Sequence, residues 1–162
     1  MIKKWFKIKG VQIQRLENKI EVLRFGDGRP MLATVAGARI TALRMLNQIN
    51  PANYPDLDER ITFYDYMANS VERKLPRFAR EYAAKHGDYP NVTIALGSIS
   101  TVGDEKSPVA ATIYDGVFDY ETDYTAIGSG SLIVEILLRD SYSSDITVDF
   151  GKKLVAYIIQ SI

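Results

Sequence analysis

Hydrophobic and polar residues alternate along the first part of the chain in the manner of paired β-strands. Residues 10–17 (GVQIQRLE) show this period-two pattern, and residues 19–23 (KIEVL) continue in strand-forming residues. Turn residues at 26–30 (GDGRP) interrupt the pattern, and the apolar run 31–36 (MLATVA) follows them. Because Asp-Gly adopts the positive φ of a tight hairpin, we expect two strands joined by this turn.

Helical periodicity then replaces the alternation. Residues 38–49 predict a core-facing helix that ends before Asn50-Pro51, with apolar positions Ile40, Leu43, Leu46 and Ile49. A longer pattern from Asp58 to about Lys85 predicts a second helix, with one apolar face made of Ile61, Tyr64, Met67, Val71, Leu75 and Phe78. Pro76 is expected to kink or split this helix, and Gly87 suits a left-handed cap at its end.

The second half of the chain repeats the order of strands followed by helices. Residues 91–100 and 108–114 predict two buried strands joined by a polar loop at 101–107, and a turn at Asp115-Gly116 leads into a further strand at 117–120. Two helices follow, from Leu132 and from Thr147, the last with Phe150, Leu154, Val155 and Ile158 pointing inward. Strands, two helices, strands and two helices together predict a layered α/β/β/α or α+β sandwich.

Length and composition narrow the class of protein. The 162 residues, with 46% hydrophobic and 25% charged residues, predict one globular domain spanning 1–162. The absence of cysteine excludes zinc–thiolate sites, iron–sulfur clusters and thiol catalysis, and the lone His86 excludes a multi-histidine metal site. We therefore expect no cofactor. Without a membrane-length apolar stretch or a signal-peptide core, we expect a cytoplasmic protein, or a virion component if it is viral.

The net charge of zero hides an asymmetry along the chain. Residues 1–50 hold ten Lys/Arg against three Asp/Glu, whereas residues 89–162 hold four against ten. Such polarity favours self-complementary packing, either within the chain or between copies of it. A nucleic acid at the basic end is the alternative, and the lack of a basic motif interleaved with aromatic residues argues against it.

Several motifs resemble those of proteasome β-type subunits and the related bacterial ATP-dependent protease subunit HslV, which are N-terminal-nucleophile hydrolases. Residues 34–37 (TVAG), which lead into a helix, resemble the family's strand ending in Ala-Gly. Residues 123–131 (DYTAIGSGS) and 138–148 (LRDSYSSDITV) resemble its Ala-x-Gly-Ser-Gly-Ser run and its Tyr-Ser-x-Asp-Met-Thr-Val helix entry. This resemblance implies a four-layer α/β/β/α sandwich in which the first strand and the last strands are missing.

The resemblance also implies site residues. Lys19 matches the lysine beside the family's nucleophile, the backbone N–H of Gly37 matches its oxyanion donor, and Ser129 matches the serine near the N-terminal amine. The family's nucleophile is an N-terminal threonine on a preceding strand, whereas the first threonine here is Thr34. Lys3 stands where an acidic residue is expected. The three candidates are therefore interpreted as relics of a site without a nucleophile.

Two other clusters have structural explanations beside chemical ones. Residues 128–131 (GSGS) before a helix could hold a phosphate, but the full phosphate-binding patterns are absent, which favours a tight turn. The carboxylates at 115–123 could bind a hard cation, but they lack the spacing of a calcium loop, which favours a solvated acidic turn.

Three functions follow as hypotheses. The first is a catalytically silent, proteasome-like subunit that builds a ring or larger assembly from copies of itself or related subunits, cellular or viral. The second is an active threonine peptidase whose nucleophile strand is missing or supplied by another chain. The third is a module of the same fold that binds nucleic acid or another partner. We favour the first, because the chemistry needs a nucleophile that the sequence does not offer.

Overall fold

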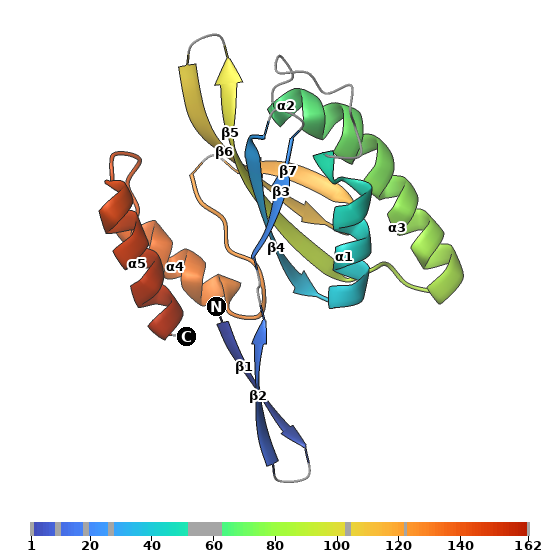
Figure 1. Cartoon of the computed structure of the whole chain (residues 1–162), viewed down its shortest axis with the longest axis horizontal. Coiled ribbons are helices and arrows are strands. Elements are labelled where there is room, and N and C mark those ends of the chain that lie inside the picture. Colours follow the sequence, from blue (N-terminus) through green and yellow to red (C-terminus); the bar gives the residue numbers. More distant parts are fainter. Residues whose placement is uncertain are drawn as a thin grey trace.

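A computed structural model describes residues 2–8, 11–17, 20–25, 28–51, 63–102, 105–121 and 123–161. Figure 1 shows the elements in chain order: β1 (Ile2–Ile8), β2 (Val11–Glu17), β3 (Ile20–Arg24), β4 (Pro30–Gly37), α1 (Arg39–Gln48), α2 (Phe63–Tyr66), the π-helical turn η2 (Met67–Val71), α3 (Glu72–His86), β5 (Val92–Val102), β6 (Glu105–Tyr114), β7 (Val117–Glu121), α4 (Ser131–Ser141) and α5 (Val148–Ser161).

Five of the strands form one antiparallel sheet in the order β3-β4-β5-β6-β7, and β1 pairs with β2 in a separate two-stranded ladder. The predicted hairpin of β3 and β4 and the predicted succession of β5, β6 and β7 are confirmed. The polar loop expected at 101–107 is wrong, because the ladder between β5 and β6 continues to the pair Val102 and Glu105. Strand β1 was not expected, since the lysines of the opening segment obscure its pattern.

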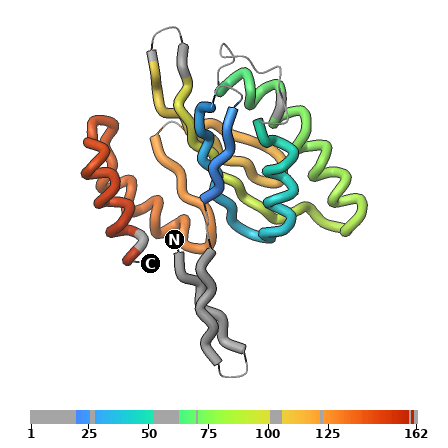
Figure 2. Tube along the Cα trace, viewed as in Figure 1, coloured from blue at the N-terminus to red at the C-terminus, as the bar shows by residue number. Residues whose placement is uncertain are grey.

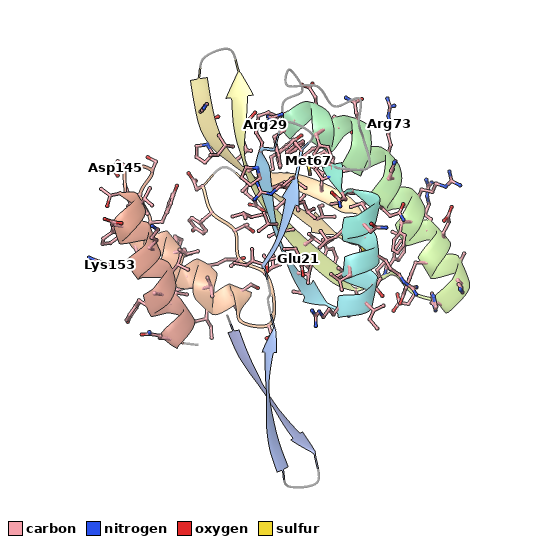
Figure 3. All side chains as sticks on the ribbon, viewed as in Figure 1. Glu21, Arg29, Met67, Arg73, Asp145 and Lys153 are labelled. Carbon is pink, nitrogen blue, oxygen red and sulfur yellow. The ribbon has the colours of Figure 1, made fainter. Side chains whose placement is uncertain are left out.

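Helices lie on both sides of the five-stranded sheet. Figures 1 and 2 show α1 and α3 on one side, where α1 contacts β4 and β5 and α3 contacts β7, whereas α4 and α5 pack on each other on the other side. The core lies between the sheet and the α1–α3 layer, where Met67 is labelled in Figure 3. Its fully buried side chains include Met31, Met45, Ile49, Tyr66, Met67, Val71, Leu75, Ile94 and Ile113.

Several predicted helix faces are rotated in the structure. In α1 the buried stripe is Ala42, Met45 and Leu46 with the following Ile49, whereas Ile40 is 72% exposed and Leu43 is also exposed. Both the expected and the observed stripes have helical spacing, so periodicity alone could not choose between them. Three further positions expected to point inward are exposed in the structure: Tyr64, Phe150 and Val155.

The predicted long helix is divided into three parts. Pro76 lies inside α3, and the departure from regular α-helix occurs earlier, at η2. Gly87 caps α3 as expected, with φ of +83° and its N–H donating to the carbonyl of Ala83 at 2.8 Å. The expected start of the helix at Asp58 and its first apolar position, Ile61, lie outside the described residues.

The sheet face opposite α1 and α3 carries small residues in its centre and large apolar residues around them. The register of the ladders places Leu32, Ala95, Gly97 and Ala110 on this face. Its exposed large apolar side chains are Ile20, Val22, Leu32, Ile99, Tyr114 and Val117. We call these six residues and their neighbours on the same side the open sheet face.

Candidate functional site

A cavity of about 490 Å³ lies on the side of the open sheet face, at the end of β4. Residues from β4, β5, β6 and β7, from the segment 125–129 and from the beginning of α4 line it. The lining includes Gly37, Thr112, Glu121, Thr125, Ser129 and Glu135. A smaller groove of about 330 Å³ adjoins it and shares Glu121, Thr125 and Glu135 as a common wall.

Gly37 allows the backbone to approach closely at this cavity, and Gly128 lies in ordinary contact with the end of β4. Gly37 has φ of +94°, and a Cβ atom added there would lie 2.2 Å from the carbonyl oxygen of Asn91. Gly128 has φ of +105°, and its added Cβ would lie 3.8 Å from the Cβ of Ala36. The segment that carries Ser129 therefore lies directly beside the end of β4.

A short chain of hydroxyl groups leads to the carboxylate of Glu121. The Thr112 hydroxyl donates to Glu121 Oε1, and the Oγ1 atoms of Thr112 and Thr125 are 2.9 Å apart. Because a hydroxyl carries one proton, the second contact requires Thr125 to donate to Thr112. All three residues are half-buried, so the chain of donors ends on a carboxylate that is partly withdrawn from water.

The structure brings together two of the three predicted relic residues. Gly37 and Ser129 both line the cavity, whereas Lys19 lies outside the described residues. The predicted tight turn at 128–131 is present, with the N–H of Ser131 donating to the carbonyl of Gly128 at 3.1 Å. In the part of the chain that the structure describes, no group of three His, Cys, Asp or Glu residues is placed to hold a metal ion.

Sequence reasoning missed the polar wall of the cavity. The acidic turn predicted at 115–123 includes Glu121 but gives it no role in a cavity, and no sequence pattern points to Thr112, Thr125 or Glu135. Thr112 and Glu121 lie close together because of the register of β6 and β7, which pairs Thr112 with Asp119 and Ala110 with Glu121. Thr125 lies between β7 and α4 and Glu135 lies on α4, so only tertiary packing brings them to the same cavity.

Two residues away from the cavity have shifted pKa values. Burial raises the pKa of the Tyr120 phenol, and the neighbouring Tyr64, Glu72 and Asp65 raise it further. The rings of Tyr120 and Tyr64 are 5.0 Å apart at the edge of the sheet. A hydrogen bond from the Ser143 hydroxyl lowers the pKa of the Asp145 carboxyl, which lies before α5. Neither group points to acid–base chemistry at Gly37 or Ser129.

Comparison with known proteins gives a likeness of fold to solved structures. The chain matches no protein-family model and no curated protein. None of the described helices is long and apolar enough to cross a bilayer.

The solved structures that the chain resembles include several of Anbu. Anbu (ancestral beta-subunit) from Yersinia bercovieri is 17% identical with a TM-score of 0.65, over 92% of this chain and 63% of that one. Anbu from Hyphomicrobium sp. strain MC1 is 19% identical with a TM-score of 0.62, over 98% and 67%. The helical assembly of the Anbu complex from Pseudomonas aeruginosa is 15% identical with a TM-score of 0.64, over 97% and 66%.

This likeness covers nearly all of the chain but only part of each Anbu subunit. The chain spans 63% of the length of the Yersinia protein. At these identities the comparison shows the fold alone. The five-stranded sheet, its helices and the cavity beside Gly37 and Ser129 thus belong to a chain with the fold of an ancestral beta-subunit.

Proposed function

We propose that the chain is a catalytically silent subunit of the proteasome β and HslV type that builds an assembly from copies of itself or of related subunits. Two independent lines support this proposal. The fold is that of Anbu, and one Anbu protein is described as a helical assembly. The run 125–131 (TAIGSGS) that resembles the family's motif lines the cavity beside Gly37.

The observation that carries the proposal is the distribution of exposed apolar side chains. The open sheet face presents six large ones, and α4 and α5 present seven more: Leu132, Ile133, Ile136, Val148, Phe150, Val155 and Tyr157. Exposed apolar side chains gathered on one sheet face and on two helices that pack together are typical of an interface. We infer that further β-structure and neighbouring subunits cover these exposed side chains. The further β-structure would be the fourth layer of the expected sandwich. Residues 1–162 would form one domain of the subunit.

The two sides of the sheet carry opposite net charge. Helices α1, α2 and α3 hold seven Lys/Arg against three Asp/Glu, whereas residues 115–161 hold three against eight. Figure 3 shows Arg73 and Asp145 on opposite sides of the sheet. A head-to-tail contact would bring the basic side of one copy to the acidic side of the next.

We infer catalytic silence because residues 1–162 place no threonine where it could act as an N-terminal nucleophile. Residues 1–33 contain no threonine, serine or cysteine. Thr34 lies inside β4, paired with Ile20 on one side and Ala95 on the other, so its nitrogen belongs to a peptide group in the middle of the sheet. An N-terminal nucleophile needs a free α-amine beside its hydroxyl, and Thr34 cannot supply one.

The alternative is an active threonine peptidase whose nucleophile strand comes from another chain, and the open cavity beside Gly37 and Ser129 favours it. Treatment of the chain, isolated together with any chains that co-purify with it, with a threonine-directed epoxyketone and with fluorogenic peptides separates the two. The proposal predicts neither covalent labelling nor turnover, together with an oligomer in light scattering. Labelling of any chain in the assembly, or turnover that the epoxyketone abolishes, would contradict catalytic silence.

A further inference from the structure

We propose that the outer face of α1 in one copy packs on α4 of the next copy, and that this is the head-to-tail contact of the assembly. The inference rests on the proposed function, because it needs an assembly of copies, and it names the two surfaces that meet. Three features carry it: an exposed apolar pair on each helix, opposite charges beside the two pairs, and an apolar groove along α4.

Helix α1 presents apolar side chains to solvent in addition to the stripe that it buries against the sheet. Ile40 is 72% exposed and Leu43 is 39% exposed, and the spacing of three residues puts them on one side of the helix. Arg44 follows Ile40 by four residues and is exposed on the same side. Apolar side chains beside an arginine are typical of protein interfaces, in which arginine is enriched. The outer face of α1 therefore suits a protein partner.

Helix α4 carries the matching pattern. Ile133 and Ile136 are exposed and are also three residues apart. Asp140 follows Ile136 by four residues and is exposed on the same side of the helix. Each helix thus has an exposed apolar pair followed by one charged residue, an arginine on α1 and an aspartate on α4. When the two helices cross in the same direction, their apolar pairs meet and the guanidinium of Arg44 comes beside the carboxylate of Asp140.

A groove along α4 gives the apolar pair of α1 a place to insert. The groove has a volume of about 330 Å³, and Leu132, Ile136 and Tyr124 contribute the apolar part of its wall. The Tyr124 ring has an edge contact with Tyr142, at 5.4 Å between ring centroids. Helices pack by placing the ridges of one into the grooves of the other, so the exposed pair of α1 forms the ridge that this groove needs.

Charge favours α4 over the neighbouring helix α5 as the partner. Helix α5 also exposes large apolar side chains, but it exposes Lys152 and Lys153 too, which would meet the arginines of α1 with like charge. Helix α4 exposes Glu135, Arg139 and Asp140. The Nε of Arg139 lies 3.8 Å from Oδ1 of Asp140. This exposed pair contributes little by itself, and the second carboxylate oxygen of Asp140 is able to accept from the guanidinium of α1.

A cross-linking experiment on the full chain tests the contact, because the sequence contains no cysteine. A chain with both Leu43→Cys and Ile136→Cys should form a ladder of disulfide-linked dimers, trimers and larger species under mild oxidation. Each single variant should run as one chain, because a head-to-tail contact brings the two positions opposite each other and neither opposite itself. The matched control combines Leu43→Cys with Tyr157→Cys, an exposed position on α5, and should give no ladder.

Three results of this experiment would overturn the proposal: an equal ladder from the control pair, dimers from Ile136→Cys alone, or no ladder from the double variant. Light scattering of the wild type distinguishes this failure from failure of the proposed function. Wild-type oligomers without the ladder overturn the contact between α1 and α4 alone. A wild-type monomer overturns the assembly itself.

Charge reversal gives a second test that needs no engineered cysteine. Arg44→Glu should raise the concentration at which half of the chains are assembled by at least about tenfold, because it places two carboxylates together. Adding Asp140→Arg should restore most of the assembly, since the pair then has opposite charges again. Lys152→Glu makes the same change of charge on α5 and should leave assembly unchanged. A loss that Asp140→Arg does not repair, or an equal loss in Lys152→Glu, would contradict the proposed contact.

Discussion

Replacing Gly37 by alanine tests whether the end of β4 approaches Asn91 as closely as the structure shows. Two costs add at this position. A side chain at φ of +94° costs about 1–2 kcal/mol, and a Cβ that would lie 2.2 Å from the Asn91 carbonyl oxygen forces a backbone shift of about 1–3 kcal/mol. Alanine also restricts the unfolded chain, which raises the free energy of unfolding by about 0.4–1 kcal/mol. The net loss expected for Gly37→Ala is therefore about 1–4.5 kcal/mol, centred near about 3 kcal/mol.

Two other glycines separate these costs. Gly28 has a similar φ of +84° but no atom within 4 Å of an added Cβ, so Gly28→Ala should lose only about 1 kcal/mol. Gly97 has no left-handed φ, and its added Cβ meets only the Val109 carbonyl oxygen at 4.0 Å. Gly97→Ala should therefore stay within about 0.5 kcal/mol of the wild type.

Urea unfolding followed by circular dichroism measures all three variants. In a chain of this size, a loss near about 3 kcal/mol should also lower the Tm by about 6–12 °C, at roughly 2–4 °C for each kcal/mol. If Gly37→Ala and Gly28→Ala lose the same stability, the close approach to Asn91 is absent and the geometry assigned to this side of the cavity is wrong.

Three further predictions concern the core, the cavity wall and the sheet edge. Met45→Ala should lower the free energy of unfolding in urea by about 2–5 kcal/mol, whereas Ile40→Ala should change it by no more than about 0.5 kcal/mol. The reverse order would support the helix face expected from the sequence. Thr112→Val should lower the free energy of unfolding by about 1–2 kcal/mol, and Thr112→Ser, which keeps the hydroxyl, should lower it much less. Equal losses would show that the hydroxyl makes no hydrogen bond to Glu121. The raised pKa of Tyr120 stabilises the fold below the unfolded phenol pKa of about 10, and this contribution is lost as the pH rises through the folded pKa. Tyr120→Phe should therefore flatten the fall in stability as the pH rises above about 10, and an unchanged slope would contradict the shift.

The sequence predicted the strands and turns better than the helix faces. Alternation and Asp-Gly turn chemistry are local properties, which is why the β3–β4 hairpin and the Asp115-Gly116 turn were found. The buried stripe of α1 depends on which side the sheet lies, and Ile40 and Met45 both belong to possible stripes. The choice between them is made by tertiary packing rather than by periodicity.

The same distinction applies to the candidate site. Gly37 and Ser129 were found because each lies in a motif that resembles a family pattern. Glu121 and Thr112 were not found as a pair, because only the register of β6 and β7 brings them together. Residues of β6, β7 and α4 thus form a polar wall of the cavity that no local sequence pattern indicates.

The central claim, a silent subunit that assembles with itself, is tested most directly by native mass spectrometry of the purified chain. A silent, self-assembling subunit should give masses that are multiples of 18.2 kDa at low ionic strength, with no covalently modified N-terminus after epoxyketone treatment. Near 1 M salt, where the screening length falls to about 3 Å, contacts between the basic and acidic sides should weaken and smaller species should gain intensity. A single species of 18.2 kDa at micromolar concentration and low salt would contradict the account.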